Sequence, residues 1–330
     1  MKLVTEENLK VFLKSLYNEF DVRVPIKLLD GTRTIGKLDA GPLSIGGGVI
    51  LKKITEVFFP QMDRVFSADG TKTEMQKPME KPMFVVGFTA QDLDCLEFID
   101  RFYSRNYHDD IYFNKRENSV IVGISGRCGT NSEFLKIAGD KCDLELICDG
   151  QDYIVVSYTE TGKKMLQKIQ NGKEVQATVL NELQKESDAL SSEDFELIKK
   201  ASKLLLEEKV PDEFWTSISD RCIACTSCNL SCPTCTCFDV FDRQIASDTR
   251  RYRMWDSCQL DGFMREVSGH NPMGRENMRT RRRIHHKLAA DVIRWGHPTC
   301  FCCGRCDMVC PTGIGIKSVC REMIDKYSYA

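Results

Sequence analysis

Cysteine is crowded into two short segments of this chain, and their spacing limits the fold more than any other feature. The first segment, Arg221–Phe238, holds six cysteines in eighteen residues. Both segments contain the pattern C-x2-C-x2-C-x3-C followed by proline. The pattern covers Cys222, Cys225, Cys228 and Cys232 before Pro233, and Cys300, Cys303, Cys306 and Cys310 before Pro311. This repeat indicates two centres that are held by the same local geometry.

The spacing predicts two [4Fe–4S] clusters, because C-x2-C-x2-C-x3-C-P is the run that binds such clusters in bacterial ferredoxins. Three thiolates two residues apart lie on one tight loop around three corners of a cubane, whereas the fourth points away. In two-cluster ferredoxins this fourth cysteine ligates the other cluster. We therefore predict crossed ligand sets, with Cys222, Cys225, Cys228 and Cys310 on cluster 1 and Cys300, Cys303, Cys306 and Cys232 on cluster 2.

Zinc sites are the main alternative, since C-x2-C pairs also occur in zinc ribbons. Zinc needs two such pairs, and not a third cysteine at the same spacing with a fourth before proline, so iron–sulfur clusters are favoured. A disulfide framework is disfavoured. Of the 17 cysteines, 13 lie at or after Cys222, and the charged amphipathic N-terminus does not resemble a secretory leader.

Length and charge set the class of protein. A chain of 330 residues can bury a full core and form two domains. No stretch approaches the roughly 18 apolar residues of a membrane helix, so we expect no membrane association and a cytoplasmic protein of a reducing, anaerobic cell. The net charge of −2 indicates no general preference for nucleic acid.

We predict an α+β fold in three parts. These are a mixed α/β domain at 1–161, a helical connector at 162–211, and a two-cluster ferredoxin-like helical domain at 212–330 with an insertion at 233–299. Periodicity predicts helices at Val4–Phe20, Asp92–Tyr103, Lys163–Glu186 and Ser192–Lys209. It predicts strands at Val22–Leu29, Val49–Ile54, Phe84–Phe88, Ser119–Ile124 and Tyr153–Tyr158.

The N-terminal half carries no recognisable catalytic or nucleotide motif. Gly46-Gly47-Gly48 is not followed by Gly-Lys-Ser/Thr, and no G-x-G-x-x-G follows a strand, so we interpret the glycines as a loop. The cysteines of this half have no ligand spacing and are expected to be buried thiols: Cys95, Cys128, Cys142 and Cys148.

The insertion is too long for a simple loop in a compact module. It contains three further cysteines and, between Arg250 and Lys287, ten Lys or Arg residues. Such a basic stretch could bind nucleic acid. Four-thiolate clusters are anionic, however, and need nearby cations, which is the interpretation we favour for a chain of near-neutral charge.

Several segments together resemble one known family. RCIACTSCNLSCPTCTCF, RYRMWDSCQLDGF, GHNP, RRRIHHK and CFCCGRCDMVCPTGI occur in this order. They are similar to the iron–sulfur subunit shared by cytosolic sulfhydrogenases (the β subunit of soluble NiFe hydrogenases) and by anaerobic sulfite reductase. The resemblance is dense from Arg221 to Ile314. This chain departs from the family at Gln91 and Gly126, where relatives have cysteines, and at Cys302, where they have glycine.

Three cysteines left over in the insertion also predict a third [4Fe–4S] cluster. Cys235, Cys237 and Cys258 remain after the first two clusters, and the RRRIHHK segment resembles the place where relatives keep a His or Cys one residue before Lys. We therefore predict His286 as the fourth ligand. An imidazole in place of a thiolate raises a cluster's potential, which would suit a site where electrons enter or leave. The alternative is that these cysteines are packing thiols and His286 a surface residue.

The resemblance implies an electron-transfer subunit of a cytosolic complex, with no catalytic site of its own. Its expected partners are a flavoprotein NAD(P)H-linked subunit and a catalytic redox subunit of hydrogenase or sulfite reductase type. The absence of a dinucleotide fingerprint from the sequence agrees with this role. The alternative of a different class is an iron–sulfur regulator that binds nucleic acid through Arg279 to Lys287.

Overall fold

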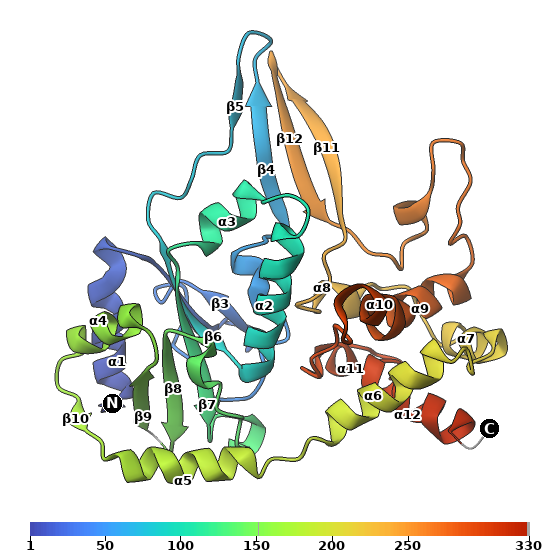
Figure 1. Cartoon of the computed structure of the whole chain (residues 1–330). Coiled ribbons are helices and arrows are strands. Elements are labelled where there is room, and N and C mark those ends of the chain that lie inside the picture. The colour runs from blue at the N-terminus through green and yellow to red at the C-terminus, as the bar shows by residue number, and fades with distance from the viewer. Residues whose placement is uncertain (151, 329–330) are drawn as a thin grey trace. The chain divides into compact units, whose positions relative to one another are not determined.

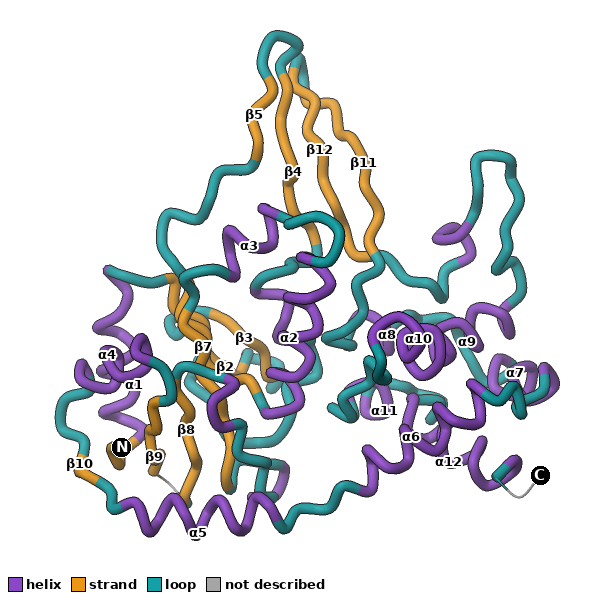
Figure 2. The backbone as a smooth tube through the Cα atoms, in the orientation of Figure 1, coloured by secondary structure: helices purple, strands orange, loops and turns teal. Residues whose placement is uncertain are grey.

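The computed structural model describes residues 1–150 and 152–328 and forms two compact units. Unit 1 comprises residues 1–58 and 77–190, and unit 2 comprises residues 59–76 and 191–330. The last two residues of the expected C-terminal domain lie outside the described residues. The elements of each unit are labelled in Figure 1 and traced by type in Figure 2.

Unit 1 is built on a mixed sheet. Among the described residues its eight strands run in the order β10-β1-β9-β8-β7-β6-β2-β3. Strands β2, β6, β7 and β8 pair in parallel, whereas the outer strands pair antiparallel. The central strands are buried on both faces, as parallel strands covered by helices are. The bounds are β1 Lys2–Thr5, β2 Asp21–Lys27, β3 Arg33–Gly36, β6 Met83–Phe88, β7 Val120–Gly126, β8 Leu144–Asp149, β9 Asp152–Ser157 and β10 Lys173–Glu174.

Helices cover both faces of this sheet. Helix α1 buries Leu9 and Leu13 against one face, and α5 buries Leu183 against Ile147 and Ile154 on the other. The two faces separate because successive strand residues point to opposite sides. The bounds are α1 Glu6–Ser15, α2 Ala90–Ser104, α3 Asp110–Arg116, α4 Glu160–Lys168 and α5 Ala177–Asp188.

Most predicted elements of unit 1 are confirmed, but one predicted strand is wrong and one predicted helix, Lys163–Glu186, is divided. Strands β2, β6, β7 and β9 and helix α2 lie where the periodicity placed them, and α1 begins after Thr5 because β1 takes the preceding residues. The strand predicted at Val49–Ile54 is wrong, since this stretch leads into a short 3-10 turn. Its neighbouring glycine loop, 46–48, is held by other partners. Arg33 donates to the carbonyls of Ser44 and Gly48, and the Gly47 and Gly48 amides donate to the Cys128 carbonyl.

The stretch 162–211, expected as a separate connector, is divided between the units. The single helix expected at Lys163–Glu186 is broken at Asn171, which has a positive φ of 60°, into α4, β10 and α5. The next helix, α6 (Glu193–Leu206), belongs to unit 2, where it buries Ile198 and Leu205. The charges of these helices lie outward, but each helix has an apolar face that packs on its own unit.

Unit 2 combines a small helical core with a four-stranded sheet among its described residues, in the order β11-β12-β4-β5. The helical core joins Trp215, Ile284, Leu288 and Val319, which come from four helices. Figure 2 shows the long hairpin of β11 and β12 beside β4. The remaining bounds are β4 Met62–Ala68, β5 Thr73–Met75, β11 Phe238–Ile245, β12 Asp248–Trp255, α7 Asp212–Ser219, α8 Ser227–Leu230, α9 Glu276–His285, α10 Asp291–Trp295, α11 Arg305–Met308 and α12 Ile316–Tyr327.

Segment 59–76 lies in the expected N-terminal domain by sequence, yet it folds with the insertion. The Trp255 indole donates to the Phe59 carbonyl at 3.0 Å, and buried Arg253 lies 3.2 Å from Asp63. These contacts complete a sheet whose strands are about 190 residues apart along the chain, a pairing that local sequence patterns do not reveal. Among residues 1–150 and 152–328, no helix has the length and apolar character of a membrane span.

Candidate metal centre

The two cysteine loops of unit 2 have the same backbone conformation. In the first loop Ala224 and Thr226 have positive φ values of 51° and 62°, and the short helix α8 follows. In the second loop Cys302 and Gly304 occupy the corresponding positions, with φ values of 60° and 74°, and α11 follows. Left-handed residues turn the chain sharply, so each loop curls around its own cysteines.

Four cysteines of the two runs line one small cavity. They are the residues predicted for cluster 1, Cys222, Cys225, Cys228 and Cys310. The last of these comes from the second run, as crossed ligation requires. The Ile314 amide donates to Cys310 Sγ at 3.3 Å, and the Ala224 amide donates to Cys222 Sγ at 3.4 Å. This arrangement supports the predicted ligand set and supplies N–H donors to its sulfurs.

The cysteines predicted for cluster 2 gather around the second loop. Cys232, the last cysteine of the first run, interacts with the Cys300 thiol, and Cys300 also lies within electrostatic range of Cys306. Cys303 belongs to the same loop. The Ile316 amide approaches Cys306 Sγ at 3.5 Å. The structure thus places Cys232 with the second run.

Three cysteines of the insertion lie close together: Cys235 and Cys258 contact Asn229, and Cys237 contacts Cys258. The Asn229 amide donates to Cys258 Sγ at 3.2 Å, and Cys235 Sγ lies 3.8 Å from Asn229 Oδ1. The Cys237 and Cys258 thiols are hydrogen-bonded to each other. This hydrogen bond, together with Asn229 and nearby cations, lowers the pKa of Cys258 to about 6. A lowered pKa favours the thiolate, which is the form that binds metal. The three leftover cysteines are close neighbours in the fold.

His286 lies apart from these three cysteines. Its Nε2 is 3.4 Å from Asp291 Oδ1, and its ring lines a different pocket. Among the interactions of the described residues, none joins His286 to Cys235, Cys237 or Cys258. The side chain that faces the cysteines from this turn is the neighbouring Lys287.

Two buried cations lie among the cysteines, and their burial bears on whether an anionic group fits between the cysteine loops. Arg283 and Lys287 are four residues apart, so they share one face of the helix, and each is only 5% exposed. Burial lowers the pKa of the Arg283 guanidinium, but thiolates from both runs, led by Cys228 and Cys306, outweigh it and raise that pKa. Burial likewise lowers the pKa of the Lys287 ammonium, but nearby thiolates, led by Cys232, outweigh it and raise that pKa.

These cations are incompletely paired with other side chains. Arg283 Nη1 donates to the Ile314 carbonyl at 3.4 Å, while its buried Nη2 has no hydrogen-bond partner among the described residues. Lys287 Nζ donates to Thr234 Oγ1 at 2.7 Å. Buried charge is costly unless an opposite charge compensates it. Four-thiolate iron–sulfur clusters supply that negative charge, so the residues present fit them.

The cysteines are not arranged around single metal ions. Within the described part of the chain, no three His, Cys, Asp or Glu side chains form a group that could hold one ion. A cubane makes a different demand, because each of its thiolates binds a different iron atom.

The basic segment Arg279 to Lys287 is largely turned inward. Three of its five cations are buried, namely Arg279, Arg283 and Lys287. This burial removes them from contact with a phosphate backbone and weakens the nucleic-acid alternative. Sequence reasoning anticipated that cations would offset the clusters. It did not identify Asn229, whose role depends on a contact 29 residues away.

The remaining cysteines lie in apolar surroundings. Burial of the four cysteines of unit 1 is confirmed, since Cys95, Cys128, Cys142 and Cys148 are all buried. Cys302 is half-buried in the second loop at the position equivalent to Ala224, and its thiol bonds to Cys300. The equivalent residue of the first cysteine loop, Ala224, is not a ligand.

Comparisons with known proteins agree with this geometry. Residues 221–314 match the family model described as a 4Fe-4S dicluster domain. The chain is similar to the sulfhydrogenase 2 subunit beta of Pyrococcus furiosus, with 27% identity over 252 residues that cover 72% of each chain. No solved structure gives a significant match. The dicluster match favours iron–sulfur clusters over zinc in both loops.

Proposed function

Because this chain belongs to the iron–sulfur subunit family of the sulfhydrogenase beta subunit, we propose that it relays electrons within a multi-subunit oxidoreductase. The [4Fe–4S] clusters supply one-electron transfer when they are bound. The protein's own part is to hold them close together and to set their potentials through charge, hydrogen bonds and burial.

One observation carries this proposal. Arg283 lies within electrostatic range of Cys228 in the first ligand set and of Cys306 and Cys232 in the second. A single side chain can face both sets only if the two sets are close neighbours. Close spacing of clusters is what a relay needs, whereas a structural role for two isolated metal sites would not need it.

We infer two partners from the chemistry that the chain lacks. It has no dinucleotide fingerprint, so a flavoprotein subunit would meet NAD(P)H. It has no catalytic motif, so a redox subunit of hydrogenase or sulfite reductase type would perform the terminal reaction. We place this complex in the cytoplasm of an anaerobic cell.

Purification of the native complex under anaerobic conditions tests the proposal. Co-purification of a flavoprotein and a catalytic redox subunit is the expected result. The recombinant chain alone should be bleached by dithionite but not by NADH or NADPH. Robust reduction of the isolated chain by NAD(P)H would show that it binds the nucleotide itself and would contradict the proposed division of labour.

The proposal includes a third cluster at Cys235, Cys237 and Cys258, with His286 as the fourth ligand. Iron and acid-labile sulfide should then be about twelve per chain, and about eight with two cubanes. His286→Ala should lower both values, while His285→Ala is the matched control. About eight irons in the wild type, unchanged in His286→Ala, would remove the third cluster. Loss of iron in Cys258→Ala but not in His286→Ala would reassign only the fourth ligand.

A further inference from the structure

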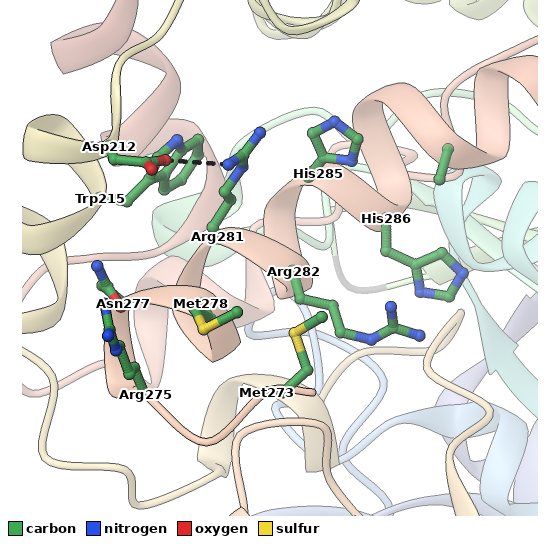
Figure 3. Close-up of a pocket in the computed structure, with 11 residues that line it drawn as sticks. Asp212, Trp215, Met273, Arg275, Asn277, Met278, Arg281, Arg282, His285 and His286 are labelled. Carbon is green, nitrogen blue, oxygen red and sulfur yellow. Dashed lines mark hydrogen bonds and ion pairs between the residues drawn. The ribbon is translucent and has the colours of Figure 1, made fainter. Parts of the chain in front are cut away.

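A pocket of about 390 Å³ lies on a side of α9 away from the cysteine loops. Figure 3 shows its lining, which comes from α7, α9 and the turns beside them. The described residues that line it include no cysteine. Its volume is within the roughly 300–1,000 Å³ typical of small-molecule sites. The pocket therefore belongs to unit 2 and contains none of the cysteine ligands, although His286, the proposed fourth ligand of the third cluster, lies in its lining.

The pocket has a surplus of positive charge. Arg281 is neutralised by Asp212 at 3.0 Å, as the dashed line in Figure 3 marks. The guanidinium groups of Arg275 and Arg282 form neither an ion pair nor a hydrogen bond with any side chain that the structure describes. Guanidinium groups bind phosphate through two parallel hydrogen bonds. Two unpaired guanidiniums on one cavity thus favour an anion of more than one charge.

The middle of the pocket is apolar. In the view of Figure 3, Met278 and Met273 lie between the Arg275 end and the Arg282 end. Trp215 also lines the pocket. Methionine sulfur packs well against aromatic rings, so the cavity suits a ligand that has a flat apolar body beside its charged group.

Trp215 is one of two pocket-lining residues that have a buried polar atom without a hydrogen-bond partner among the described residues. Its side chain is 1% exposed, and its indole N–H has no hydrogen-bond partner among the described residues. Buried tryptophan N–H groups usually have one. Asn277 Oδ1 is unpartnered as well, while its Nδ2 donates to Thr216 Oγ1 at 3.2 Å. Both atoms are shielded from solvent, so the contacts of a ligand in the open pocket fall on the arginine and methionine side chains.

We propose that this pocket binds a phosphorylated small molecule with an aromatic body, whose phosphate contacts Arg282 and whose body packs on Met273 and Met278. Arg275 binds the polar group at the opposite end. Nucleic acid fits less well, because three cations of the same segment are buried and leave no continuous basic stripe.

Calorimetric titration of the anaerobic, cluster-loaded chain tests this site with phenyl phosphate, inorganic phosphate and phenol. Phenyl phosphate should bind more tightly than either of its parts. Arg282→Gln should raise its Kd at least tenfold, and Arg275→Gln should raise it less. Arg294→Gln is the matched control, because Arg294 is exposed on α10 and does not line the pocket. The Kd of the Arg294→Gln variant for phenyl phosphate should equal that of the wild type.

Retention of the wild-type visible absorbance shows that each variant is folded and loaded. Arg282→Lys keeps the charge and should give an intermediate Kd, which a purely structural role for Arg282 would not produce. The proposal is overturned if phenyl phosphate does not bind at millimolar concentration, or if it binds equally to the Arg275→Gln/Arg282→Gln double variant. Binding of a glutamate-rich peptide without binding of phenyl phosphate would assign the pocket to an acidic protein segment instead.

Discussion

Cys148 in unit 1 and Cys258 in unit 2 are almost equally buried, at 4% and 6% exposed, but their thiols behave in opposite ways. Each thiol is hydrogen-bonded to a second free cysteine, Cys148 to Cys128 and Cys258 to Cys237. The bond to Cys128 and burial raise the pKa of Cys148, whereas the bond to Cys237, the Asn229 amide and two cations lower that of Cys258. The shift at Cys258 belongs to a hydrogen-bonded pair, since the pKa of its partner Cys237 is raised, so burial by itself does not set the direction.

The difference lies in what surrounds each pair. Cys128 and Cys148 belong to an apolar core that includes Ile124 and the buried aliphatic residues of the neighbouring strands. The cysteines of unit 2 are instead gathered around Arg283 and Lys287, with amide N–H groups directed at several sulfurs. We interpret the first environment as packing and the second as a set of ligands for an anionic group.

Removal of the clusters should have the largest effect, and only on unit 2. Chelation would leave Arg283 and Lys287 buried without their anionic partners, which costs about 3–5 kcal/mol. Amide hydrogen exchange in α9 and α12 should then accelerate roughly 10²- to 10³-fold, while β7 and β8 remain protected. Equal acceleration in both units would mean that the clusters do not stabilise unit 2 selectively.

Single ligand substitutions should have the next largest effect and should test the crossed assignment. Cys310→Ser and Cys222→Ser are expected to alter the same electron paramagnetic resonance signal, because both thiols line one cavity. Cys300→Ser should alter the other signal. Cys320→Ser is the control, since this thiol is buried in the apolar core of α12. If Cys310→Ser changed only the signal that Cys300→Ser changes, the crossed sets would be wrong.

Loss of one buried cation should produce a smaller change, in potential and not in stability alone. Arg283→Gln removes a positive charge that favours the reduced cluster, so the midpoint potential should fall by roughly 50–100 mV, the order expected for one nearby unit charge at an effective dielectric of about 20. Arg283→Lys should retain most of the wild-type potential, and Arg294→Gln should not change it. A redox titration that found Arg283→Gln and wild type identical would remove this role.

The smallest effect is expected in unit 1. Cys148→Ala should lower the free energy of unfolding by about 1–2 kcal/mol through lost packing, and it should leave the iron content unchanged. Cys258→Ala, at an equally buried position, should lower iron and sulfide. Denaturant unfolding and iron analysis of the two variants measure the comparison directly. Iron loss in Cys148→Ala would show that unit 1 also binds metal.

The sequence by itself determined the chemistry of the two cysteine loops. Four ligands within eleven residues, from Cys222 to Cys232, depend on local backbone geometry, and local geometry is encoded by spacing and by the proline that follows. Regular periodicity likewise located α2 and strands β2, β6, β7 and β9 of unit 1, whereas it missed the central strand β8. Local patterns suffice for such features because their partners are close along the chain.

Only the tertiary structure decided which distant groups meet. Pairing of β4 with β12 moved segment 59–76 into unit 2, and the strand predicted at Val49–Ile54 gave way to a bend that leads into a short 3-10 turn. The fold also turned Arg283 and Lys287 inward while His286, beside Lys287, faces Asp291. Adjacent residues on a helix point about 100° apart, so the side that faces the cysteines depends on how the helix packs, which spacing alone does not encode.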